Sequence, residues 1–180
     1  CFNDCRRDGE TIFIFKTIVM TRDRIIKAFS ALGKVMLSIG KGEEWKGYEL
    51  GVTEDEYKAL QLNVKRQFQW NGWFTEEAVC HVFNVWGEEL VEENLNRFTS
   101  KYAFQETPKK IGVIMAGNLP LVGFHDFLCV LLSGNSIVIK LSSDDKTLFP
   151  MLIQLLVKFE PQLQNRISIP SGKLGDVDAI

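Results

Sequence analysis

Apolar residues recur at helical spacing through the first half of the chain. The pattern predicts a first helix over residues 21–37, with Thr21 suited to cap its start. Its apolar face is made by Ile25, Ile26, Phe29 and Leu32. Thr53, followed by three acidic residues, predicts a second capped start and a helix over 54–69. A third helix is predicted from Thr75 onward, and a short one from Glu92 to about Tyr102.

The pattern changes after Pro108, where continuous apolar runs rich in β-branched residues replace the helical period. Strands are predicted over 110–116, 136–141 and 166–170, with a fourth at the carboxyl end, 177–180. Helices are predicted between them, over 120–133 and from Asp144 onward, with Pro150 as a mild kink. Gly134 is suited to end the first of these helices.

Alternation of apolar strands with helices is typical of an α/β fold with a parallel sheet covered on both faces. We therefore predict a helical N-terminal segment followed by a Rossmann-like parallel sheet. The expected division is residues 1–19 as an extension, with Met20 as the natural start, 20–107 as a helical region, and 108–180 as the first part of a dinucleotide-binding domain.

Composition argues against several classes of function but identifies none. The 180 residues are 46% apolar and 24% charged, as in ordinary globular proteins, and the net charge of −2 argues against nucleic acid as a partner. No apolar run is long enough to predict a membrane span. The four cysteines form no disulfide framework, so a cytoplasmic location is predicted. With two isolated histidines, no metal site is expected.

Chemistry is expected where the predicted parallel strands end, because ligands of such sheets bind beyond the carboxyl ends of the strands. Two ends qualify, residues 116–118 and 140–143. Lys140, Ser142 and Ser143 could donate to a ribose or phosphate. Both segments are also ordinary turn and cap chemistry, and neither G-x-G-x-x-G nor a P-loop is present. The residues alone therefore favour a nucleotide site and ordinary turn and cap structure about equally.

The stretch GVIMAGNLPLVGFHDFLCVLLSGNSIVIKLSS resembles the acyl-CoA reductase family, the NADPH-dependent reductases that make fatty aldehydes. That family belongs to the aldehyde dehydrogenase superfamily, whose pattern is a strand, Pro-Trp-Asn-Phe-Pro, a helix, Gly-Asn with a strand, and Lys-Pro-Ser-Glu. The similarity covers roughly residues 73–180 and is most specific in 111–146. It implies a sheet of the aldehyde dehydrogenase type, incomplete in this chain.

The resemblance assigns roles to individual residues. Asn118 matches the asparagine whose side-chain amide stabilises the oxyanion of a thiohemiacetal, and Lys140 matches the lysine that binds the adenosine ribose. Backbone positions along the cofactor correspond to Met115, Ala116 and Gly117.

Three departures from the superfamily pattern matter. Ser143 replaces a glutamate that binds ribose hydroxyls in NAD-preferring relatives, which favours NADPH, with NADH as the alternative. Gly117 replaces a tryptophan. The nucleophilic cysteine of the family lies downstream of the matched region, so we expect it outside this chain, and Cys80 and Cys129 read as small core residues.

The leading interpretation is the N-terminal, cofactor-binding part of an NADPH-dependent reductase that converts a fatty acyl-CoA to the aldehyde through a cysteine thioester. The expected partner is the acyl thioester substrate, with self-association through the missing part. One alternative is an NAD(P)-dependent aldehyde dehydrogenase, for which a general-base glutamate would be required. The other is a non-catalytic nucleotide-binding or partner-binding module.

Overall fold

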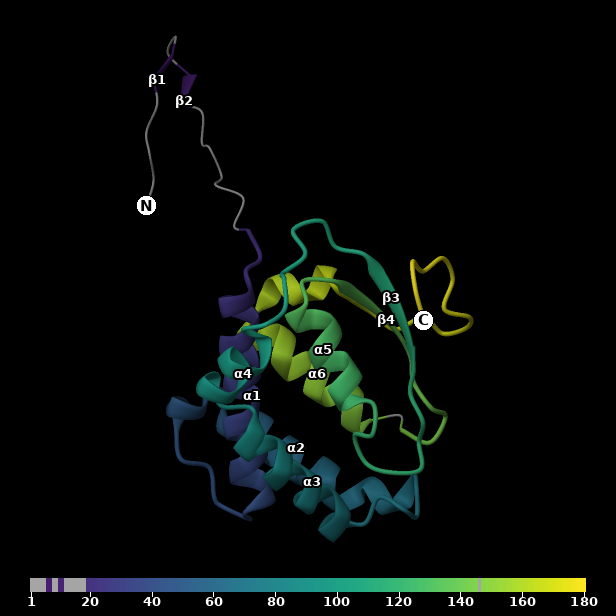
Figure 1. Cartoon of the computed structure of the whole chain (residues 1–180). Coiled ribbons are helices and arrows are strands. Elements are labelled where there is room, and N and C mark those ends of the chain that lie inside the picture. Colours follow the sequence, from purple (N-terminus) through teal and green to yellow (C-terminus); the bar gives the residue numbers. More distant parts are fainter. Residues whose placement is uncertain (1–5, 8–9, 12–18, 146) are drawn as a thin grey trace.

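A computed structural model describes residues 6–7, 10–11, 19–145 and 147–180 (Figure 1). The prediction that residues 1–19 form an extension falls mostly outside these ranges. The elements, with η for 3-10 helices, are β1 (Arg6–Arg7), β2 (Glu10–Thr11), α1 (Arg22–Gly40), η1 (Tyr48–Leu50), α2 (Glu54–Arg66), η2 (Gln67–Gln69), α3 (Glu76–Glu89), α4 (Glu92–Thr99), β3 (Lys110–Ile114), α5 (Phe124–Leu132), β4 (Ser136–Lys140), α6 (Leu148–Phe159), η3 (Pro161–Asn165) and β5 (Ile167–Ser168).

Threonine caps begin three of the predicted helices, which confirms that part of the sequence analysis. The Thr53 hydroxyl accepts from the Glu56 N–H at 3.3 Å, and the Glu56 carboxylate accepts in turn from the Thr53 N–H at 2.7 Å. Thr21 and Thr75 cap α1 and α3 in the simpler, one-sided way. Each cap satisfies an amide that the first helical turn leaves unpaired.

The second half of the chain is an α/β unit built on a small parallel sheet of order β3-β4-β5. β3 and β4 pair from Lys110↔Ser136 to Ile114↔Lys140. β5 adds two residues beside β4. Because consecutive parallel strands are joined by crossovers of one hand, α5 and α6 lie on the same face of the sheet (Figure 1).

The expectation of helices on both faces is therefore wrong for the described chain. Opposite α5 and α6, Gly112 of β3 faces the C-terminal segment, where a β-carbon on the glycine would meet Leu174, Val177 and Ile180. The predicted fourth strand, 177–180, is reduced to a single parallel bridge between Ile111 and Ala179.

Two helices start later than predicted. α5 begins at Phe124 rather than residue 120, because Leu121 takes a left-handed conformation (φ 56°) that no helix can include. α6 begins at Leu148 rather than Asp144, since the buried Asp145 side chain accepts from the Phe149 N–H at 3.2 Å. Pro150 then falls in the first turn of α6, where a missing N–H does no damage and no kink is required.

One core joins the helical region to the sheet. Its centre is a group of phenylalanines, each at most 2% exposed, from α1, α5 and α6. The ring centroids of Phe29 and Phe127 are 5.8 Å apart and those of Phe127 and Phe149 5.3 Å apart, both edge to face. Such pairs add about 0.5–1.5 kcal/mol to the burial of the rings.

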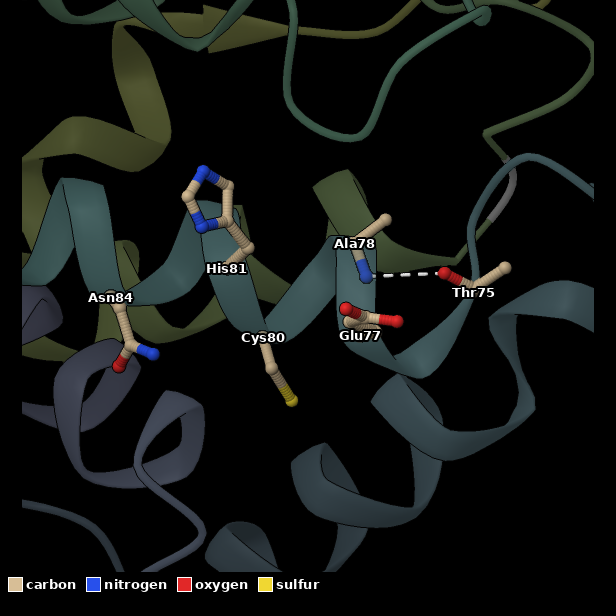
Figure 2. Close-up of a pocket in the computed structure, with 6 residues that line it drawn as sticks. All are labelled: Thr75, Glu77, Ala78, Cys80, His81 and Asn84. Carbon is tan, nitrogen blue, oxygen red and sulfur yellow. Dashed lines mark hydrogen bonds between the residues drawn. The ribbon is translucent and has the colours of Figure 1, made fainter.

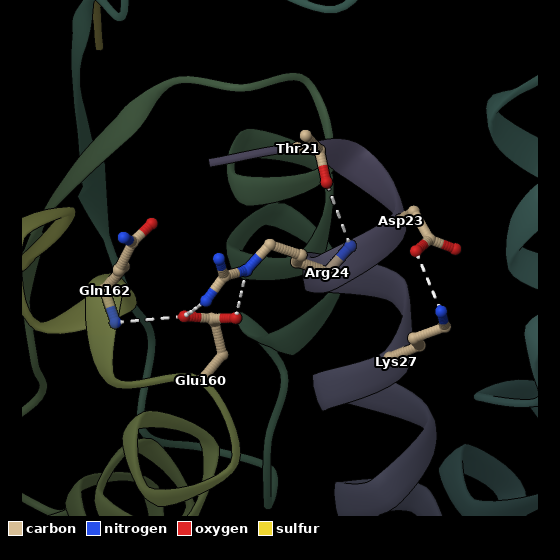
Figure 3. Close-up of polar contacts among 6 residues, drawn as sticks. All are labelled: Thr21, Asp23, Arg24, Lys27, Glu160 and Gln162. Atoms are coloured by element: carbon tan, nitrogen blue, oxygen red, sulfur yellow. Dashed lines mark hydrogen bonds and ion pairs between the residues drawn. The ribbon is translucent and has the colours of Figure 1, made fainter. Parts of the chain in front are cut away.

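A charged cluster joins α1 to the segment that follows α6, near the amino ends of the strands (Figure 3). Arg24 donates through Nε and Nη2 to the two carboxylate oxygens of Glu160, at 2.7 and 2.8 Å. The N–H of Gln162 adds a third bond to the same carboxylate, at 3.1 Å. Arg166, just before β5, donates to the Gly134 carbonyl after α5, whose positive φ (88°) confirms it as the residue that ends that helix. We call this side of the sheet the amino edge.

Candidate active site

The two loops that leave the carboxyl ends of β3 and β4 lie against each other. We call residues 115–123 the first loop, and residues 141–145 with Thr147 the second loop. The Met115 N–H donates to the Lys140 carbonyl at 3.0 Å, which joins the loops at their starting points. The two segments that the sequence singled out are therefore neighbours, and we call this side of the sheet the carboxyl edge.

Gly117 of the first loop packs tightly against Ser142 of the second loop. A β-carbon there would lie 2.7 Å from the Ser142 Cβ and closer still to its Oγ, so no larger residue fits without movement. The tryptophan that the wider superfamily pattern would place here is excluded by this contact. The glycine thus has a packing reason in the structure that the sequence alone did not supply.

The residues with assigned roles differ in exposure. Met115 is buried against Gly123, whereas Ala116 is exposed and Gly117 half-buried. Asn118, Lys140 and Ser143 are exposed, and Ser142 is half-buried. The edge therefore offers solvent an amide, an ammonium and a hydroxyl, a donor set that suits the oxygens of a nucleotide ribose or phosphate.

The carboxylate of Asp144 lies beside Ser143. The Ser143 hydroxyl donates to the Asp144 Oδ1 at 3.3 Å, and the Asp144 N–H donates to the Ser142 Oγ at 3.2 Å. A 2′-phosphate bound at Ser143 would meet this negative charge. The contact weakens the argument for NADPH that rests on the serine replacing a glutamate.

Asp145 is predicted to lie in a helix, but it precedes α6 and is part of the second loop. It is 6% exposed, and burial raises the pKa of its carboxyl, while backbone N–H groups of Phe149 and Leu148 lower it in part. It lines a small pocket together with residues of both loops, including Met115 and Ser142. Two adjacent aspartates before an apolar helix were the available signal, but they do not reveal which one is buried.

Two buried amides from the helical region also reach this edge. Asn71 Nδ2 donates to the Gly117 carbonyl at 2.7 Å, and Gln67 Nε2 donates to the Thr147 hydroxyl at 2.8 Å. Residues 70–73, WNGW, follow the helix predicted over 54–69, and their sequence gives no sign of this contact. A polar residue in a turn carries no local sign of the carbonyl it will bond.

The two described cysteines show no activation. Burial, with a smaller contribution from Glu76, raises the pKa of the Cys80 thiol, and burial with Asp126 does the same for Cys129. Cys80 lines an open cavity of about 570 Å³ on α3, where Figure 2 shows it pointing away from the neighbouring His81. Cys129 Sγ lies 3.7 Å from His125 Nε2, too far for a strong bond. A nucleophilic thiol needs a lowered pKa, so neither fits that role.

Among the residues that the structure describes, no group of three or more histidine, cysteine or acidic side chains could hold a metal ion. In the same part of the chain, no helix combines the length and apolar character needed to cross a bilayer.

The fold and the paired loops define an α/β protein whose candidate ligand site lies at the carboxyl ends of a parallel sheet. A family model described as acyl-CoA reductase (LuxC) matches residues 85–174, half of the chain and all of both loops. The chain therefore belongs to the acyl-CoA reductase (LuxC) family, as its resemblance predicted. Searches of curated proteins and of solved structures give no match. Asn71 and Gln67 lie outside the matched residues.

Proposed function

We propose that this chain supplies the cofactor-binding part of an NADPH-dependent reductase that converts a fatty acyl-CoA to the aldehyde through a cysteine thioester. The observation that carries the proposal is the contact between the two loops, which brings Asn118 and Lys140 to one exposed edge within the residues that match the family. In this proposal residues 108–180 are the first part of a dinucleotide-binding domain of the aldehyde dehydrogenase type, and 20–107 are a helical region before it.

The donor set fits a dinucleotide. Lys140 would bond ribose hydroxyls from the end of β4, Ser142 and Ser143 would flank the same sugar, and the backbone of residues 115–117 would line the cofactor. Gly117 adds no side chain of its own, and Ser142 packs against it. When bound, the reduced nicotinamide supplies a hydride to the thioester carbon.

Asn118 would act on the charge that this reduction creates. Acyl transfer from CoA to a cysteine thiolate releases CoA as a thiolate, which then takes up a proton from water. Hydride addition to the acyl carbon leaves a negative charge on its oxygen. The Asn118 amide can donate to that oxygen, and a preorganised donor of this kind is worth about 10²–10³ in kcat. Collapse of this thiohemiacetal anion breaks the C–S bond, which releases the aldehyde and regenerates the cysteine thiolate.

We infer from the resemblance to the family that the nucleophile is a cysteine downstream of the matched residues, outside residues 1–180. Neither described cysteine has the lowered pKa that acyl transfer requires. Self-association through that further part and a cytoplasmic location remain predictions from the sequence.

A fluorescence titration of the full-length protein with NADPH and NADH tests the cofactor site. We expect both to bind, NADPH more tightly, and Lys140→Ala to weaken both by about tenfold, the loss of one or two charge-assisted hydrogen bonds. Lys110→Ala, an exposed lysine at the opposite end of the neighbouring strand, is the matched control and should bind as wild type. Failure of both cofactors to bind would overturn the site.

Asp144→Asn tests the cofactor preference separately. Removing the carboxylate beside Ser143 should favour NADPH over NADH by about three- to tenfold, because a 2′-phosphate no longer meets a negative charge there. Wild-type protein that binds NADH tenfold more tightly than NADPH would refute the preference for NADPH while leaving the reductase assignment in place.

A further inference from the structure

The hydrogen bond from Asn71 to Gly117 joins a turn of the helical region to the first loop of the candidate site. Asn71 is 7% exposed, and the two residues are 46 positions apart in sequence. The neighbouring Gln67, 1% exposed, makes the equivalent link to Thr147 of the second loop. The segment 67–71 therefore bonds to both loops.

Asn71 is itself held firmly. Its Oδ1 accepts from the Trp73 N–H at 3.0 Å, so both ends of the side-chain amide are bonded. Its own N–H donates to the Gln67 carbonyl, and its carbonyl accepts from the N–H of Phe74, which is fully buried in the core. The orientation of the amide is therefore fixed by its surroundings before it reaches Gly117.

The carbonyl that Asn71 bonds belongs to the peptide unit between Gly117 and Asn118. Because a peptide unit is planar, holding its oxygen also fixes the nitrogen and Cα of Asn118, the base from which that side chain extends. Gly117 lacks a β-carbon since Ser142 occupies the space, and a glycine leaves its own backbone dihedrals weakly restrained. An external bond at this peptide supplies the restraint that the glycine removes.

We propose that Asn71 is a positioning residue for Asn118, acting through the Gly117 carbonyl to hold the oxyanion donor in its productive orientation. The proposal rests on the proposed function, in which Asn118 donates to the oxyanion. An error of about an ångström in the placement of a catalytic group can cost up to 10²-fold in rate, so loss of the bond should appear in kcat rather than in substrate binding.

A double-mutant cycle in the full-length enzyme tests the proposal. Asn71→Ser keeps a side-chain acceptor for the Trp73 N–H, as serine does in comparable turns, but is too short to reach Gly117. We expect it to lower kcat for acyl-CoA reduction about tenfold with KM changed less than about threefold. In an Asn118→Ala background the same change should alter kcat less than about twofold, because the donor it positions is gone.

The outcomes separate this inference from the function on which it rests. Unchanged kcat in Asn118→Ala overturns both. A large loss in Asn118→Ala, with an Asn71→Ser effect that is absent or multiplies fully in the double variant, overturns only the positioning role and leaves Asn71 a structural turn residue. Thermal unfolding midpoints accompany each rate. If Asn71→Ser does not fold, Asn71→Asp, which also keeps the acceptor, enters the same cycle with the same deciding outcomes.

Discussion

The two edges of the parallel sheet use their polar residues differently. At the amino edge, three charged side chains are bonded within the protein: Arg24 and Glu160 bond each other through two contacts, and Arg166 bonds a backbone carbonyl. Other polar side chains of that edge, such as those of Lys110 and Asn165, are exposed. At the carboxyl edge, Asn118 and Lys140 extend into solvent. Polar groups bonded to one another stabilise the fold, whereas exposed donors are free for a ligand.

The difference extends to the backbone. At the amino edge the backbone conformations are the usual ones: Gly134 ends α5, and a 3-10 helix leads into β5. The carboxyl edge carries a left-handed Leu121, a glycine pressed on Ser142 and a buried Asp145. Departures of this kind gather at functional sites because they cost stability and persist only where the surroundings hold them. The comparison therefore predicts that variants of the exposed donors at the carboxyl edge affect activity, and that variants of the bonded charged groups at the amino edge affect stability.

The largest expected effect is that of Asn118→Ala. Loss of the proposed oxyanion donor should lower kcat by about 10²–10³, while the unfolding midpoint stays unchanged because the side chain is exposed. Steady-state reduction of an acyl-CoA and a thermal melt measure the two quantities. Asn165→Ala, an exposed asparagine at the amino edge, is the control and should change neither. Equal losses in both variants would remove the distinction between the edges.

Gly117→Ala should affect both quantities at once. The added β-carbon meets Ser142 and forces the loops apart, a strain of about 1–3 kcal/mol. We expect a lower unfolding midpoint and a kcat reduced by about tenfold, since Asn118 follows directly in the displaced loop. Gly172→Ala is the matched control, because a β-carbon there meets no atom within 4 Å. A fully active, fully stable Gly117→Ala would show that the loop contact does not matter.

Caps and helix faces, which depend on residues close together in the sequence, were predicted correctly. Specific contacts between the loops and the helical region were not predicted. The Thr53 cap and the apolar face of α1 depend on residues within a few positions, and the structure has both. The pairing of β3 with β4 followed from their apolar character. The contact of Gly117 with Ser142 and the bond from Asn71 to Gly117 join residues 25 and 46 positions apart, and depend on how separate elements pack. No pattern within either segment contains that information.

The predicted starts of α5 and α6 were wrong for a related reason. Proline at position 120 and aspartate at 144 are good first-turn residues, but Leu121 and Asp145 are drawn into buried positions that set other conformations. Tertiary packing overrode local preference in both loops of the candidate site. Such conflicts between local and global preference are expected at functional sites, and both lie in the loops of the candidate site.

Glu160→Gln tests the amino edge. Burial pushes the pKa of Glu160 up, but the bonds from Arg24 and from the Gln162 N–H outweigh it and hold the pKa below its usual value. The variant should lower the unfolding midpoint by about 5 °C at pH 7. A lowered carboxyl pKa stabilises the fold above the pKa of the unfolded chain and ceases to do so as pH falls through the folded one.

The difference in midpoint between wild type and Glu160→Gln should therefore shrink as pH is lowered from about 5 to 3. The kcat should not change, because Glu160 lies at the edge away from Asn118. A midpoint difference that stays constant with pH would assign the loss to packing rather than to the ion pair. A reduced kcat would contradict the functional separation of the edges.

Asp145→Asn gives the smallest expected effect. It contrasts with Glu160→Gln because it should raise the unfolding midpoint and not lower it. Burial raises the pKa of Asp145, so the folded state holds this proton more tightly, and stability falls as pH rises from the unfolded carboxyl's pKa through the folded one. Asparagine keeps the oxygen that accepts from the Phe149 N–H without the charge. We expect a midpoint raised by about 2–4 °C at pH 7, equivalent to about 1 kcal/mol.

Melts from pH 7 to pH 3 should show this gain disappear in acid, while Asp144→Asn, its exposed neighbour, should leave the midpoint unchanged throughout. A lowered midpoint would contradict the assignment of a cost to the buried charge. If the stabilised variant also binds cofactor less tightly, the unfavourable carboxylate serves the site, because the loop it shapes is needed for the ligand. If binding is unchanged, its only role is to start α6, and the carboxyl edge carries less functional strain than its backbone suggests.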